Sequence, residues 1–141
     1  MSDKKEIQEV YSHTQRDSNL TYLVTTVNRL DFEMGITLFV KGSVITGQLI
    51  SGLKYHRYIE NSLASAGVVG EALSGYFKQT AENLYAPTKN ENDEYNDIPC
   101  NFIHLNNVSI QNGNGGFNKI NNAYLRISLD EIDGHIIGSA S

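Results

Sequence analysis

The stretch FEMGITLFVKGSVITGQLIS, residues 32–51, decides the fold of this chain. Its first half alternates apolar side chains with other residues, as a strand with one buried face requires, at Phe32, Met34, Ile36, Leu38 and Val40. Residues 41–43 supply a turn, and residues 44–51 return as a second strand. Gly47 inside the returning strand predicts a bulge or a sharp bend. The stretch therefore predicts an antiparallel β-hairpin.

The segment just before the hairpin predicts a helix. Its apolar residues recur at helical spacing, at Leu20, Leu23, Val24, Val27 and Leu30. Its Thr and Val residues favour a strand instead, because β-branched side chains lose rotamer freedom in a helix. We predict the helix because the spacing fits without a miss. Residues 1–18 are polar and show no sustained period, so they predict a flexible N-terminal tail before a single domain at residues 19–141.

A helical insertion is predicted after the hairpin, over residues 52–85, with a break near Ala66 and Gly67. Its second half carries an apolar stripe at Val69, Leu73, Tyr76, Phe77, Ala81 and Leu84. Residues 86–99 contain both prolines and almost no apolar side chains, which predicts a mobile loop.

Strand patterns return in the last third of the chain. Residues 101–110 alternate, but the apolar phase slips near Asn106 and Asn107, which predicts a bulge. A polar turn at residues 111–116 leads to an alternating strand at residues 123–129 and a short last strand at residues 132–137. The fold class is therefore α+β, with a five-stranded antiparallel sheet, an N-terminal helix and a helical insertion between strands 2 and 3. The same element order is that of a small Sm-like barrel, and an open sheet fits the pattern equally well.

Composition limits the possible functions. The 141 residues fit one domain, and a net charge of −5 argues against binding nucleic acid through bulk charge. Charged residues make up only 19% of the chain, so its surface offers little electrostatic resistance to self-association. Cys100 is the only cysteine, and no apolar stretch is long enough for a signal or membrane segment. We expect a cytoplasmic protein without membrane insertion.

No catalytic constellation can be nominated from the residues. Cys100 has no accompanying base in the sequence pattern, and His56, His104 and His135 are isolated from one another along the chain. The acidic residues 130–133 predict a turn rather than an acid–base pair. We therefore predict no catalytic, cofactor or metal-binding residues, and no cofactor.

Tyrosines of the helical insertion form the most informative set of side chains. Tyrosine is favoured at protein interfaces because it brings a large contact area with few torsions. Most of these rings are expected in the core. Any that are exposed would mark a surface for self-association or partner docking, and the candidates are Tyr55, Tyr58, Tyr76 and Tyr85.

Three blocks occur together in order, at residues 36–51, 102–107 and 129–138. In order and separation they resemble the gas vesicle accessory protein GvpU family, over most of residues 20–138. The resemblance implies a non-enzymatic accessory protein that influences gas-vesicle assembly or clustering. It also implies partners among gas-vesicle shell or other accessory proteins, and together with the low surface charge it predicts a homo-oligomer.

The alternative function is an Sm-like nucleic-acid-binding or general protein-interaction module. Nucleic-acid binding requires basic or aromatic groups gathered on one face of the barrel. The sequence offers only scattered cations for this role, at Lys54, Arg57, Lys119 and Arg126.

Overall fold

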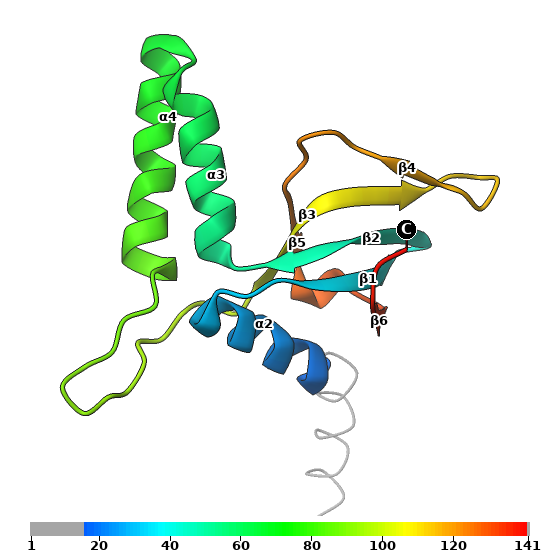
Figure 1. The fold of residues 1–141 in the computed structure, drawn as a ribbon, viewed down its shortest axis with the longest axis horizontal. Coiled ribbons are helices and arrows are strands. Elements are labelled where there is room, and N and C mark those ends of the chain that lie inside the picture. Colours follow the sequence, from blue (N-terminus) through cyan, green and yellow to red (C-terminus); the bar gives the residue numbers. More distant parts are fainter. Residues whose placement is uncertain (1–15, 141) are drawn as a thin grey trace, which may run out of the picture.

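The computed structural model describes residues 16–140, and these residues form an α+β fold (Figure 1). In chain order the elements are α2 (Ser18–Leu30), β1 (Met34–Val40), β2 (Ser43–Ile50), α3 (Gly52–Ala64), α4 (Gly67–Thr80), a π-helical turn η1 (Ala81–Tyr85), β3 (Phe102–Gln111), β4 (Phe117–Lys119), β5 (Leu125–Ser128), a 3-10 turn η2 (Leu129–Glu131) and β6 (Gly134–Ile137). The predicted hairpin is confirmed as β1 and β2, and the predicted first helix as α2.

The six strands form one sheet in the order β4-β3-β2-β1-β6, with β5 also paired to β3. All of the pairings are antiparallel. The long β3 pairs with β5 through its first half and with β4 through its second half. Because β4 and β6 lie at opposite ends and do not pair, the sheet is open. The open-sheet alternative is therefore confirmed, and the Sm-like barrel is wrong.

The sheet has one strand more than the five predicted, because residues 117–119 form β4. Its three residues pair with the end of β3, from Ser109 to Gln111. A strand of three residues is too short to display an apolar period, so sequence reasoning could not detect it.

A β-bulge bends the centre of the sheet. Thr46 pairs with Ser109 and Gln48 with Asn106, so that Gly47 faces two residues of β3. One of these, Asn107, adopts a left-handed backbone with φ of 50°. A Cβ on Gly47 would lie 2.7 Å from the carbonyl oxygen of Asn106, so only glycine fits opposite the bulge. The predicted bulge is confirmed.

One face of the sheet packs on α2 to form the core. Asp17 caps this helix, because its side chain accepts hydrogen bonds from the backbone N–H groups of Asn19 and Leu20. The buried apolar residues of the core come from α2, from the three strands β1, β2 and β3, and from η2: Leu20, Val24, Val27, Ile36, Leu38, Ile45, Leu49, Ile103, Leu105, Val108 and Leu129.

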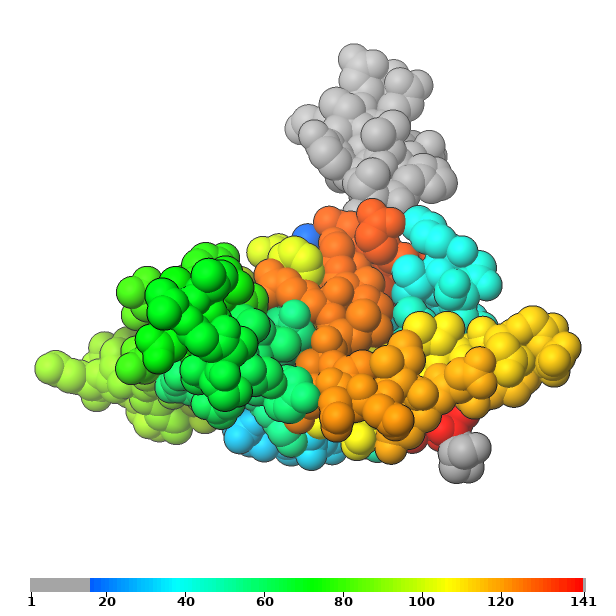
Figure 2. Space-filling model, turned by 90° about the horizontal axis from the view of Figure 1, so that it is seen from above, coloured from blue at the N-terminus to red at the C-terminus, as the bar shows by residue number. Residues whose placement is uncertain are grey.

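The opposite face of the sheet is polar, with buried Thr37, Thr46, His104 and Asn106. Helices α3 and α4 form an antiparallel pair that extends away from the sheet beyond the end of β2 (Figure 1). We call this pair the helical arm. In Figure 2 its green residues make a lobe beside the orange strand region. The predicted break is confirmed, because α3 ends at Ala64 and α4 begins at Gly67, whose φ is 80°.

The apolar stripe predicted for α4 is largely excluded from the core. Val69, Leu73 and Tyr76 are 71%, 48% and 66% exposed. Helix α4 instead approaches α3 through small side chains, and the Ser74 hydroxyl donates a 2.8 Å hydrogen bond to the Glu60 carbonyl. Small residues allow the two backbones to come close, so the large apolar side chains remain on the outside of the arm.

Two segments were predicted to be flexible, the N-terminal tail and the loop at residues 86–99. Most of the predicted tail, residues 1–15, lies outside the described residues, while Arg16 binds Asp130 with 2.6 Å between Nε and Oδ1. The predicted loop at residues 86–99 contains an isolated bridge between Lys89 and Tyr95. The mobility of this loop stays a prediction.

Candidate functional site

A pocket of about 540 Å³ lies where the helical arm meets β3 and β5. We call it the insertion pocket. Helix α3 starts directly after β2, and η1 returns the chain toward the same place, so both ends of the arm contribute to its wall. The lining residues are Tyr55, His56, Tyr76, Phe77, Thr80, Leu84, Tyr85, Pro99, Asn101, Phe102 and Arg126.

The pocket brings together three of the four tyrosines selected from the sequence. Tyr76 is 66% exposed at the rim, Tyr55 is half-buried and Tyr85 is only 3% exposed. Tyr85 packs over Gly52, where any Cβ would collide with its ring. Tyr58 lies elsewhere and stacks on Tyr124, with 3.7 Å between the ring centroids. The four tyrosines therefore do not form one exposed surface.

Two histidines that are distant in sequence meet at the base of the pocket. The ring centroids of His56 and His104 are 5.6 Å apart, and the two residues are 2% and 1% exposed. The His56 Nδ1 atom donates to the Gly52 carbonyl oxygen over 2.7 Å. This bond assigns the proton of the neutral ring to Nδ1 and leaves Nε2 as an acceptor. Their separation along the chain gives no sign of this contact, which forms because α3 carries His56 onto the sheet face that holds His104.

Arg126 of β5 joins the two histidines. Its Nη1 atom lies 3.2 Å from Nε2 of His56 and 3.4 Å from Nε2 of His104. Its guanidinium also lies over the Phe102 ring, 3.8 Å from the centroid. Arg126 is therefore held in one place by two rings that accept and one ring that stacks.

Burial keeps the histidines of this cluster neutral. Desolvation, together with the charge of Arg126 and the neighbouring His56, lowers the pKa of His104 to about 3. Desolvation also lowers the pKa of His56, against the opposing effect of its bond to the Gly52 carbonyl. Burial raises the pKa of Tyr85, and the nearby Arg126 acts in the opposite direction. At neutral pH the cluster thus carries a single positive charge, on Arg126.

Sequence reasoning named Arg126 only as one of four scattered cations and did not place it beside the histidines. The alternation was correct, since Leu125 and Ile127 pair with residues of the core face of β3. That pattern gives no information on what covers the other face. The aromatic residues of the insertion were the one indication in the sequence, because buried aromatic rings need another surface of the protein to pack against.

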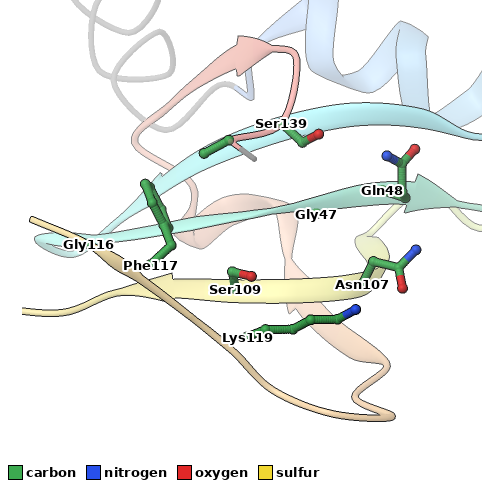
Figure 3. Close-up of a pocket in the computed structure, with 9 residues that line it drawn as sticks. Gly47, Gln48, Asn107, Ser109, Gly116, Phe117, Lys119 and Ser139 are labelled. Carbon is green, nitrogen blue, oxygen red and sulfur yellow. The ribbon is translucent and has the colours of Figure 1, made fainter.

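A second pocket of about 530 Å³ lies on the polar face of the sheet, and we call it the sheet pocket. Figure 3 shows Gln48, Asn107, Ser109 and Lys119 on β2, β3 and β4, with Ser139 of the C-terminal segment across from them. Lys119 is exposed, and none of the lining residues is acidic. The sheet pocket therefore offers polar contacts but no buried charge.

The other charged and nucleophilic residues considered in the sequence analysis, the acidic residues 130–133 and Cys100, contact nearby side chains. Arg16 binds Asp130 and lowers the pKa of its carboxyl group, while Lys41 lies 3.7 Å from Glu131 and 3.6 Å from Asp133. The Thr25 hydroxyl lies 3.5 Å from Sγ of Cys100. Within residues 16–140, no group of three or more His, Cys, Asp or Glu side chains is placed to hold a metal ion.

Fold and pocket together define a small α+β protein whose distinctive features are a projecting helical arm and an aromatic pocket at its base. The chain belongs to the family described as gas vesicle protein GvpU-like, whose model matches residues 17–140. This family is a gas vesicle accessory family, and the resemblance drawn from the three sequence blocks is confirmed. Comparisons with curated proteins and with solved structures found no match. Among the described helices, none combines the length and the hydropathy that a membrane span requires.

Proposed function

We propose that this chain is a non-catalytic accessory protein of the cytoplasm that influences gas-vesicle assembly or clustering through self-association and contact with the vesicle shell. Family membership supports the gas-vesicle context. The observation that carries the contact mechanism is the outer surface of α4, which we call the arm face. Its residues are Val68, Val69, Leu73 and Tyr76, exposed by 85%, 71%, 48% and 66%.

The arm face has the properties of an association surface. Val69, Leu73 and Tyr76 follow one another at spacings of four and three, so they lie on one side of the helix. Burying apolar surface contributes roughly 25 cal/mol per Å² removed from water. The nearest charged residues of α4, Glu71 and Lys78, are of opposite sign, so they do not repel a second copy strongly. Burial of the arm face against another apolar surface is therefore energetically favourable.

The edge strand β6 is another exposed apolar element. Ile136 and Ile137 are 54% and 64% exposed on this strand of four residues. The chain then folds back over the sheet, where the Gly138 N–H donates to the Gly35 carbonyl oxygen and the Ala140 N–H to the Thr46 hydroxyl. An edge strand of only four residues is a poor template for strand addition. The arm face is for this reason the favoured surface.

Shell contact is tested by flotation of isolated gas vesicles with the purified protein. We expect the wild-type chain to rise with the vesicles and the double variant Val69→Glu/Leu73→Glu to remain in the lower fraction. The matched control is Tyr22→Glu/Leu30→Glu, which places the same charges at positions that are 70% and 58% exposed on α2. Equal flotation of all three proteins would refute a role for the arm face, and no flotation of the wild type would refute shell contact.

Nucleic-acid binding is not proposed, because the barrel that motivated it is absent and its cations are mostly engaged. Lys54 pairs with Glu33, and Arg57 lies 2.9 Å from Glu60. Arg126 binds the two histidines. Of the four cations considered, Lys119 alone is exposed without an ion pair among the described residues.

A further inference from the structure

We propose that the insertion pocket binds a small organic acid, with a carboxylate held by Nε and Nη2 of Arg126 and an apolar, ring-bearing body against the aromatic wall. This site shares only Tyr76 with the arm face, and the variants that test the two surfaces change other residues, so either proposal can fail without the other.

The first observation that supports this site is the set of N–H donors on the Nε and Nη2 edge of Arg126. Within residues 16–140, Nη1 donates to the two histidines, the Tyr85 hydroxyl also lies beside the guanidinium, and no carboxylate of that range forms a salt bridge with Arg126. The N–H groups of Nε and Nη2 lie on the same edge of the guanidinium and point in parallel. This edge matches the two oxygens of a carboxylate, and bidentate pairs of this kind are the strong ones.

Arg16 provides an example of the same arrangement within the chain. Its Nε and Nη2 atoms bind the two oxygens of Asp130, over 2.6 and 3.3 Å. Its Nη1 atom meanwhile donates to the Cys100 carbonyl oxygen over 2.7 Å. Arg126 uses Nη1 in the same way, toward two histidines. Within residues 16–140, however, no carboxylate binds its Nε and Nη2 atoms as Asp130 binds those of Arg16. The geometry of Arg16 thus defines where the oxygens of a ligand would bind at Arg126.

The surroundings of Arg126 favour an anion. None of the residues that line the insertion pocket is acidic, so no carboxylate of the wall repels a ligand. His56 and His104 are neutral and fix the guanidinium by accepting from it, which leaves one positive charge to be balanced. Charge interactions are stronger beside buried aromatic rings than in water. A ligand with one negative charge therefore complements the site.

The rest of the pocket defines the body of the ligand. A volume of about 540 Å³ lies within the range of small-molecule sites. Most of the wall is aromatic or aliphatic, with few polar groups to satisfy: Tyr55, Phe77, Leu84 and Phe102 are its main apolar parts. A flat ring can pack against these side chains while its carboxylate reaches Arg126. The chemical class is accordingly an aryl-substituted short-chain acid.

The test is a calorimetric titration of the full chain with 3-phenylpropionate as the probe, and with 3-phenylpropionamide as its uncharged counterpart. We expect saturable binding of the acid with a Kd at or below about 1 mM. The amide should bind at least about tenfold more weakly, because it cannot satisfy two parallel donors with two charged oxygens. Absence of saturable binding by the wild type, or equal binding of acid and amide, would overturn the proposal.

Two variants locate the site. Arg126→Gln removes the donor edge and should abolish binding of the acid, with circular dichroism as the check on folding. Leu84→Glu keeps Arg126 and changes a side chain that is 47% exposed at the pocket, so the fold should tolerate it. It should weaken binding of the acid more than about tenfold, because charge repulsion adds to the lost apolar contact, and weaken the amide clearly less, because the amide loses only the contact of its ring with Leu84. Unchanged binding of the acid to Leu84→Glu would place the probe elsewhere and refute the proposed site.

Discussion

The free energy of unfolding is expected to fall by about 3 kcal/mol as the pH drops from about 6.5 to about 4, through His104 alone. The pKa of His104 is lowered to about 3 in the folded chain from an ordinary value of 6.5. The unfolded chain therefore takes up a proton first. Stability is complete above pH 6.5 and declines toward pH 3, by about 1.4 kcal/mol for each pH unit. Urea denaturation at several pH values measures this slope.

The variant His104→Gln separates the titration from packing. It should cost stability at neutral pH, because the buried imidazole fits between Tyr55 and Tyr85. Its acid slope should nevertheless be shallower than that of the wild type by about one proton. His135→Gln is the control for removing a histidine from another strand of the sheet. An unchanged slope in His104→Gln would mean that His104 is not the neutral, buried group described above.

Replacing Leu38 by alanine is expected to destabilise the chain by about 3 kcal/mol, measured by urea denaturation at neutral pH. Leu38 is fully buried on the core face of β1, where it packs in the cluster covered by α2. The loss combines the transfer of apolar surface with the cavity that remains. Leu30→Ala, at a position 58% exposed, is the matched control and should cost less than about 1 kcal/mol. Similar losses for both variants would contradict the placement of the core beneath α2.

Sequence patterns predicted the hairpin strands, the first helix and the bulge, because each depends on residues that are close together in the chain. Alternation placed β1 and β2, because one face of each must be apolar to cover α2. The phase slip at Asn106 and Asn107, and a glycine opposite them, located the bulge before any partner strand was known. The helical spacing of residues 20–30 prevailed over their β-branched composition, since α2 buries Leu20, Val24 and Val27.

The sequence predicted three tyrosines of the candidate site but not its histidine and arginine cluster, because that cluster depends on contacts between distant segments. His56 and His104 meet only because the arm begins at the end of β2, over the polar face of β3. Nothing in the strand pattern around Arg126 indicates that this face is covered by the arm. The small residues that face α3 explain why the large apolar side chains of the α4 stripe lie mostly outside. Whether an apolar helix face meets its own sheet or another molecule is decided by tertiary packing.

The central claim is that the arm face of α4 mediates association between copies of this chain. Static light scattering over a range of protein concentrations tests it most directly, using the wild type, Val69→Glu/Leu73→Glu and the control Tyr22→Glu/Leu30→Glu. If the chain associates through the arm face, the measured mass will rise above 15.7 kDa with concentration in the wild type and the control. The mass of the arm variant will not rise. A wild-type mass equal to that of one chain at every concentration, or a rise that survives in the arm variant, would contradict the account.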